Sequence, residues 1–229
     1  MVPTCLLIRH GRTSANAQGV LAGCSPGVHL DDLGREQAQH VAERLRHVPL
    51  AGIITSPLER TRQTSEAIET LQVQAGNDIA VRLDDRVIEC DYGEWTGREL
   101  KKLGKDPLWK QVQGHPSSVT FPGGESMRAM QGRAIEAVRY WNAEFGDKAT
   151  YVVVSHGDVI KALVADALGI HLDHFQRIAV DPGSMSIIDY TSARPYVIRT
   201  NDTGSDTSFL HKRKRKRAAD AAVGGGAGR

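Results

Sequence analysis

The 229-residue chain has few cysteines and no long apolar run. Cys5, Cys24 and Cys90 are odd in number and never form a C-x-x-C pair, which argues against a disulfide framework and a structural zinc site. No stretch approaches the roughly 20 apolar residues that a membrane-spanning helix needs. The first residues, MVPT, carry no basic side chain ahead of a short apolar run, unlike a secretory signal. We therefore expect a cytoplasmic protein with reduced thiols and no membrane partner.

The formal net charge of +2 conceals an uneven distribution. From His211 onward the chain carries seven Lys or Arg residues and one Asp, so this part has a net charge of +6 and the rest −4. Residues 201–229 pass from Thr, Ser, Gly and Asp through HKRKRKR to a glycine-rich end. Because such a composition buries too little apolar surface to offset the entropy of ordering, we expect a disordered tail. Its basic run, at 212–217, is typical of a solvated tail, with electrostatic contact to nucleic acid or anionic lipid as the alternative.

Residues 1–200 have the pattern of a single α/β domain. Apolar runs of four to six residues alternate with helix-like periodic stretches, as in a sheet covered by helices. We predict a three-layer α/β/α domain with a mostly parallel central sheet. The expected strands are residues 5–8, 52–55, 80–83, 150–154, 184–188 and 196–199. Helices are expected after Asp31, after the capping-box spacing of Ser56 to Glu59, and over residues 125–145.

The segment of residues 91–124 is less regular and rich in Gly, Pro, Lys and Trp. Irregular segments of this length in compact domains are often lids or binding walls. We expect a small cap here. Trp109, within it, either lines the mouth of a pocket or simply packs.

Two of the expected strands end on the same polar pattern, RHG at residues 9–11 and SHG at residues 155–157. In an open α/β sheet, ligands bind beyond the carboxyl ends of the strands. The glycine after each histidine allows a tight turn and a close approach to a ligand, and a helix that starts there offers free N–H groups to an anion. The pattern predicts that His10, His156 and Gly157 lie at a phosphate site.

Basic side chains near these histidines favour the same interpretation. Arg9 precedes the first histidine, and Arg60 and Arg62 lie in the first turns of a helix that follows a strand. Arginine binds phosphate oxygens in a planar, bidentate manner. Arg9 and Arg60, together with a protonated His156, could neutralise a phosphoryl group of about −2 charge without a metal. Asn16 could add an amide donor.

A phosphoryl-transfer site also needs a proton donor for the leaving oxygen. Glu89, Asp91 and Glu94 all follow the strand expected at 80–83, so at least one carboxyl group can reach the same crevice. Position alone leaves all three as candidates. Such a site needs a nucleophile, groups that bind the phosphate anion, and an acid. The histidines and arginines could supply the first two, and any of the three carboxyl groups could supply the acid.

Two metal sites and a binding protein are the competing interpretations. His156-Gly-Asp158 has the H-x-D form of a non-haem iron site, but that site needs a further histidine and leaves Arg9 unexplained. His171-x-x-His174 has the spacing of metal ligands on a helix, although a solvated helix start is favoured there. A phospholigand-binding protein without turnover would use the same pocket.

Five motifs carry a resemblance to a known family. In chain order they are LLIRHGRTSAN (6–16), SPLERTRQT (56–64), IECDYGEWTG (88–97), FPGGES (121–126) and VVVSHGDVIKAL (152–163). Over roughly residues 6–190 the sequence resembles the histidine phosphatase superfamily, in its phosphoglycerate mutase-like branch. The resemblance implies a phosphoglycerate mutase-like fold and a reaction that uses neither a metal nor another cofactor.

The resemblance also assigns roles to residues. It implies that His10 is the nucleophile that becomes phosphohistidine and that Glu89 is the proton donor. The phosphate pocket would then be formed by Arg9, Asn16, Arg60 and His156.

Two positions depart from the family pattern. Many members have Glu or Gln where this chain has Arg12, and many have Gly or Asn where it has Asp158. Arg12 either extends the cationic surface toward a second negative group of the substrate or faces solvent. The mutases proper carry a longer insertion between the acid and the second histidine, whereas Glu89 and His156 are 67 positions apart here. We therefore expect a phosphatase acting on a small phosphorylated metabolite, with a phosphoglycerate mutase-type phosphomutase as the alternative.

Overall fold

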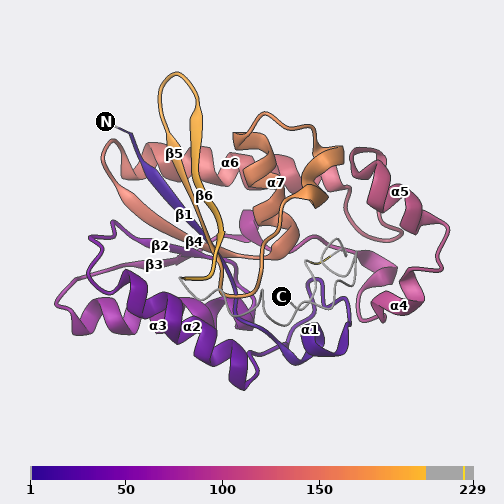
Figure 1. Cartoon of the computed structure of the whole chain (residues 1–229), viewed down its shortest axis with the longest axis horizontal. Coiled ribbons are helices and arrows are strands. Elements are labelled where there is room, and N and C mark those ends of the chain that lie inside the picture. The colour runs from indigo at the N-terminus through magenta and orange to yellow at the C-terminus, as the bar shows by residue number, and fades with distance from the viewer. Residues whose placement is uncertain (1, 205–223, 225–229) are drawn as a thin grey trace.

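The computed structural model describes residues 2–204 and Gly224, and its centre is a six-stranded sheet (Figure 1). The order across the sheet is β3-β2-β4-β1-β5-β6. The first four of these are mutually parallel, whereas β5 runs antiparallel to β1 and β6 antiparallel to β5. The strands are β1 (Thr4–Arg9), β2 (Ile53–Thr55), β3 (Val81–Leu83), β4 (Thr150–Ser155), β5 (Met185–Tyr190) and β6 (Pro195–Asp202). The predicted α/β sheet is confirmed, with an antiparallel pair at one edge.

Helices cover both faces of this sheet. Figure 1 shows α2 and α3 on one side of it and α6 and α7 on the other, which gives the three layers expected from the sequence. The helices are α1 (Ser14–Gln18), α2 (Asp32–Leu45), α3 (Glu59–Gln74), α4 (Leu100–Leu103), α5 (Leu108–Gly114), α6 (Met127–Phe145) and α7 (Gly157–Ala167). The 3-10 turns are η1 (Asp85–Val87), η2 (Gly93–Trp95), η3 (Pro116–Ser118) and η4 (Leu172–Arg177).

The central strands are buried on both faces, because successive side chains of a strand point to opposite sides of the sheet. In β1, Cys5 and Leu7 join the core beneath α6 and α7, whereas Leu6 and Ile8 join the core beneath α2 and α3. For this reason β1 is a continuous run of apolar residues. Arg9, at the end of this strand, lies deep in the molecule.

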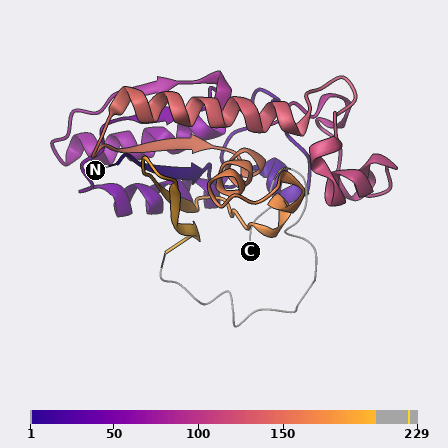
Figure 2. The same ribbon diagram turned by 90° about the horizontal axis from the view of Figure 1, so that it is seen from above.

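The cap segment is more helical than its sequence indicates. It contains η2, α4, α5 and η3, and both views place α4 and α5 at the end of the molecule opposite the N-terminus (Figures 1 and 2). Trp109 stacks on Trp95, with ring centroids 6.0 Å apart. The packing role of Trp109 is therefore the one that the structure supports.

The helix starts test the predicted caps. Asp31 caps α2 as expected, because its Oδ1 accepts the Gly34 N–H at 2.8 Å. The capping box at Ser56 is wrong: α3 begins at Glu59 after Leu58, and no side chain caps that end. The serine hydroxyl instead takes part in the site described below.

The folded part of the chain extends slightly past residue 200. β6 continues to Asp202, whose carboxylate pairs with Arg44 at 2.9 Å. The tail predicted to be disordered begins at residue 201; apart from residues 201–204 and Gly224, it lies outside the described residues. Among the described helices, none is both long and apolar enough to cross a membrane.

Candidate active site

Strand register brings the two histidines together. Arg9 pairs with Ser155 at the carboxyl ends of the parallel strands β1 and β4, so His10 and His156 follow at neighbouring positions. The backbone N–H of His10 donates to the Ser155 carbonyl at 3.1 Å. The two imidazole rings meet edge to face, with centroids 5.2 Å apart.

The hydrogen bond at His10 defines its tautomer. His10 Nδ1 lies 2.7 Å from the Gly11 carbonyl oxygen, and because a carbonyl only accepts, Nδ1 carries the proton. Burial, followed by the cationic Arg60 and Arg9, lowers the pKa of His10 well below its usual value. His10 is therefore a neutral imidazole at pH 7, with an electron pair on Nε2.

His156 makes a contact that the sequence did not indicate. Its Nε2 lies 2.8 Å from Ser56 Oγ. Burial, followed by Arg60 and His10, lowers the pKa of His156 well below its usual value. His156 is therefore neutral in the unliganded pocket, and its protonation beside a bound phosphate stays a prediction.

Two buried arginines supply the positive charge of the site. Arg60 Nη2 donates to the Gly23 carbonyl at 2.6 Å, and its Nη1 has no hydrogen-bond partner among the described residues. Arg9 Nη1 donates to the Val180 carbonyl at 2.8 Å. Backbone carbonyls thus fix both guanidinium groups in place without neutralising them.

Glu89 is the carboxyl group that reaches this cluster. It is buried, and its Oε1 accepts the Cys90 N–H at 3.0 Å. Burial, together with the nearby Asp158 carboxylate, raises the pKa of Glu89 to about 7, so the carboxyl group holds a proton up to neutral pH. Of the alternates, Asp91 and Glu94 are exposed and do not line the pocket.

Asn16 lies on α1 at the wall of the pocket. Its Oδ1 accepts the Thr13 N–H at 3.1 Å and the Thr13 hydroxyl at 2.9 Å, which closes a capping box at the start of α1. With the amide oxygen engaged, the NH₂ group is the end of this side chain that can donate to an anion.

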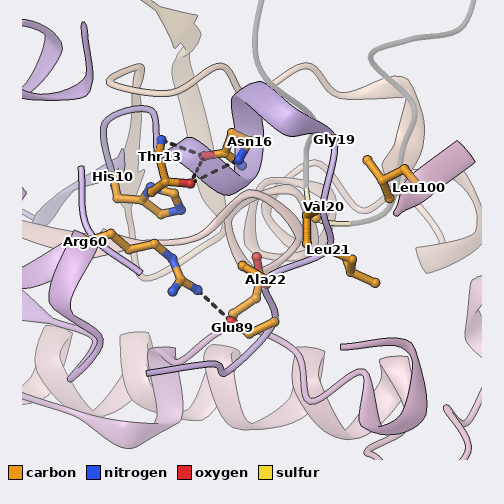
Figure 3. A pocket seen from close by; sticks show the side chains of 12 residues that line it. His10, Thr13, Asn16, Gly19, Val20, Leu21, Ala22, Arg60, Glu89 and Leu100 are labelled. Atoms are coloured by element: carbon orange, nitrogen blue, oxygen red, sulfur yellow. Dashed lines mark hydrogen bonds between the residues drawn. The ribbon is translucent and has the colours of Figure 1, made fainter. Parts of the chain in front are cut away.

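These side chains surround one pocket (Figure 3). Its lining residues are His10, Thr13, Asn16, Gly19, Val20, Leu21, Ala22, Gly23, Arg60, Glu89, Leu100 and Gly224. His156 and Arg9 do not line it directly; both are fully buried, with His156 against His10. The open space inside is about 20 Å³.

The other predicted binding residues lie outside the pocket lining. Arg12 Nε pairs with Asp31 Oδ2 at 2.7 Å. Gly157 is buried as the first residue of α7, and Arg62 is exposed on α3. The structure thus does not bring Arg12 to the phosphate pocket, because Asp31 at the start of α2 holds it elsewhere.

The metal interpretations find no support in the geometry. No three His, Cys, Asp or Glu side chains among the described residues form a group that could hold a metal ion. His171 caps η4, where its Nδ1 accepts the Asp173 N–H at 3.3 Å, and Asp158 accepts the Tyr92 hydroxyl proton at 2.8 Å.

Sequence reasoning missed Ser56, Asp158 and Gly224 as site residues. Ser56 directly follows β2, so the strand-end rule that singled out His10 and His156 would have found it. Asp158 was noticed only as a departure from a family pattern, and nothing in the sequence around Gly224 indicates a pocket.

Comparisons with known proteins agree with this geometry. A family model described as "Histidine phosphatase superfamily (branch 1)" matches residues 5–203. Phosphoserine phosphatase 1 of Hydrogenobacter thermophilus is 31% identical over 206 residues, covering 86% of this chain and 92% of that protein. The probable phosphoglycerate mutase GpmB of Salmonella choleraesuis is 32% identical over 210 residues, covering 89% of this chain and 93% of the relative.

Comparison of the fold with solved structures agrees with these sequence matches. Among solved structures, Bacillus stearothermophilus YhfR superposes with a TM-score of 0.79 at 28% identity, covering 87% of this chain and 97% of that one. The resemblance inferred from the five motifs is confirmed. The chain belongs to branch 1 of the histidine phosphatase superfamily and is an enzyme of that family.

Proposed function

We propose that this enzyme hydrolyses a small phosphate monoester through a phosphohistidine intermediate on His10, without a metal ion. The observation that carries the proposal is the state of His10, a buried neutral imidazole whose Nδ1–H is held by a carbonyl. Its Nε2 electron pair is then available for attack on phosphorus, in a pocket that also contains Arg60 and Glu89.

In the first step, His10 Nε2 attacks the phosphorus of the bound monoester. A bond forms between nitrogen and phosphorus, and the bond between phosphorus and the ester oxygen breaks. The Glu89 carboxyl group gives its proton to the departing alkoxide, which leaves as an alcohol. A carboxyl group with a pKa of about 7 holds this proton at neutral pH, whereas an ordinary glutamate does not.

In the second step, water replaces the alcohol. The Glu89 carboxylate takes a proton from a water molecule. The water oxygen attacks phosphorus, and the bond between phosphorus and His10 breaks. Inorganic phosphate leaves, His10 returns to its neutral state and Glu89 is protonated again.

Arg9 and Arg60 stabilise the charge on the phosphoryl oxygens throughout. Fixed, buried guanidinium groups stabilise such charge far more than they would in bulk solvent. A phosphate dianion beside His156 also favours protonation of this imidazole, so its neutral state belongs to the unliganded pocket.

A phosphorylated amino acid is the substrate class to examine first. The relative from Hydrogenobacter thermophilus is named a phosphoserine phosphatase, and it aligns with most of this chain. Phosphoserine is a small phosphorylated metabolite, which is the substrate class expected from the sequence. The similarity to a probable phosphoglycerate mutase favours a phosphomutase as the second candidate.

The leaving-group dependence of Glu89→Gln tests the proposed acid. Glutamine keeps the shape but cannot donate the proton, so this variant should hydrolyse phosphoserine about 10²–10⁴-fold more slowly. p-Nitrophenyl phosphate should be affected far less, because nitrophenolate leaves readily without a proton. Asp91→Gln, an exposed change nearby, is the control. An equal loss on both substrates would show that Glu89 is not the leaving-group acid.

The pH dependence provides a separate check on Glu89. Because its pKa is raised, the reactive form is the protonated one, present below about pH 7 and lost above it. Because kcat/KM reports ionisations of the free enzyme, kcat/KM on phosphoserine should fall by about tenfold per pH unit above this value. The same alkaline decline on p-nitrophenyl phosphate would indicate another titrating group.

Products distinguish the phosphatase from the mutase. With 3-phosphoglycerate and a trace of 2,3-bisphosphoglycerate, we expect inorganic phosphate as the product if this substrate is accepted. Efficient formation of 2-phosphoglycerate, detected by proton NMR, would establish a mutase activity instead.

A further inference from the structure

Ser56 is fully buried beside His156, although the proposed hydrolysis gives its hydroxyl group no role. The residue directly follows β2, and its N–H donates to the Val154 carbonyl of the neighbouring strand β4 at 3.1 Å. Its own carbonyl oxygen accepts the Thr61 hydroxyl proton at 2.9 Å. These two contacts fix the backbone of Ser56, and its Oγ then lies 2.8 Å from His156 Nε2.

The surroundings of this hydroxyl group indicate the direction of the hydrogen bond. Ser56 Oγ accepts the Leu58 N–H at 3.5 Å, and within the described part of the chain His156 Nε2 is the acceptor that lies beside its proton. Burial, followed by basic side chains, lowers the pKa of His156 and leaves the ring neutral. Those basic side chains are Arg60, His10, Arg9 and Arg133. A hydroxyl group that donates to Nε2 of a neutral imidazole leaves the ring proton on Nδ1.

The other ring nitrogen of His156 is a buried group in need of a partner. Among the described residues, Nδ1 of this fully buried side chain has no hydrogen-bond partner, and neither has Arg60 Nη1. Buried polar groups without a partner cost free energy, and in native proteins they often belong to a functional site.

The position of these two groups relates them to the phosphoryl group. The rings of His156 and His10 lie edge to face, and His10 lines the pocket together with Arg60. A phosphoryl group bonded to His10 therefore comes next to His156, and its oxygens only accept hydrogen bonds. It satisfies the His156 Nδ1–H and the free Arg60 N–H at once.

We propose that Ser56 is a positioning residue of the phosphate site, whose hydroxyl group donates to His156 Nε2 and so keeps the ring proton on Nδ1, where it is given to a phosphoryl oxygen. The proposal rests on the phosphate site of the proposed function, but it does not require that the enzyme hydrolyse any particular ester.

The same contact also suits a protonated His156. When a bound phosphate dianion favours protonation, Nε2 takes a proton from solvent, and the Ser56 hydroxyl group turns and accepts the new N–H. A serine hydroxyl group both donates and accepts, so it keeps the ring in one orientation in both protonation states. His156 then presents its Nδ1–H to phosphate throughout.

The tautomer of His156 in the unmodified, full-length protein is the first measurement. Nitrogen-15 NMR of the unliganded protein at neutral pH, with the His156 signals identified by their loss in His156→Gln, should show a proton on Nδ1 and an unprotonated Nε2. A proton on Nε2 alone would overturn the proposal, because Nδ1 would then have nothing to donate.

Ser56→Ala removes the hydroxyl group and little else. Without it, His156 should show a mixture of the two neutral tautomers. The Kd for inorganic phosphate, measured by titration calorimetry, should rise by about tenfold, because a hydrogen bond to the charged phosphate is lost or weakened.

Ser155→Ala is the matched control. Ser155 is also a fully buried serine at the carboxyl end of a strand, β4, and it is adjacent to His156 in the sequence. Its hydroxyl group donates to the Val87 carbonyl at 2.7 Å and not to an imidazole. This variant also loses one buried hydrogen bond, but it should keep the His156 tautomer and the phosphate affinity of the unmodified protein.

Equal phosphate affinity in the two alanine variants would overturn the proposal, as would an unchanged His156 tautomer in Ser56→Ala. Either result would mean that the Ser56 hydroxyl group only supports the fold. Failure of the proposed function has a different signature. Phosphate would then still bind, and His156 would still carry its proton on Nδ1, but phosphoserine would release no phosphate.

Discussion

The burial of Arg9 and Arg60 beside His10 is the constraint on which the rest of the site depends. Guanidinium groups keep their charge even when buried, so their neighbours adjust their protonation states instead. Burial of the imidazole, followed by the charges of Arg60 and Arg9, lowers the pKa of His10 and leaves it neutral, with an electron pair on Nε2. Backbone carbonyls hold both guanidinium groups in place without cancelling their positive charge.

The pKa of Glu89 is shifted in the opposite direction. The arginines alone would keep it ionised, but burial and the Asp158 carboxylate outweigh them and raise its pKa. The same pocket thus holds a base without its proton, at His10, and an acid with its proton, at Glu89. Pairs of groups whose surroundings separate their pKa values in this way are typical of acid–base chemistry.

Much of this arrangement could be predicted from short sequence patterns. His10, His156 and Arg9 follow from strand ends, since parallel strands bring their carboxyl ends to one edge of the sheet. The predictions that failed concern residues whose contacts lie far away in the sequence. Ser56 has the pattern of a helix cap, yet its hydroxyl meets His156, a hundred positions away. Arg12 looked available to a substrate, but Asp31 holds it, and no local pattern relates Gly224 to Arg9.

The position of the phosphoryl group on the trapped intermediate tests the central claim most directly. The Nδ1–H of His10 is held by the Gly11 carbonyl, so only Nε2 can form the bond to phosphorus. Rapid base quenching during turnover of phosphoserine, followed by phosphorus NMR and peptide mass spectrometry, would identify the phosphorylated atom. The account predicts an acid-labile phosphoryl group on His10 Nε2. A phosphoryl group on Nδ1 or on His156, or turnover with no histidine adduct, would contradict it.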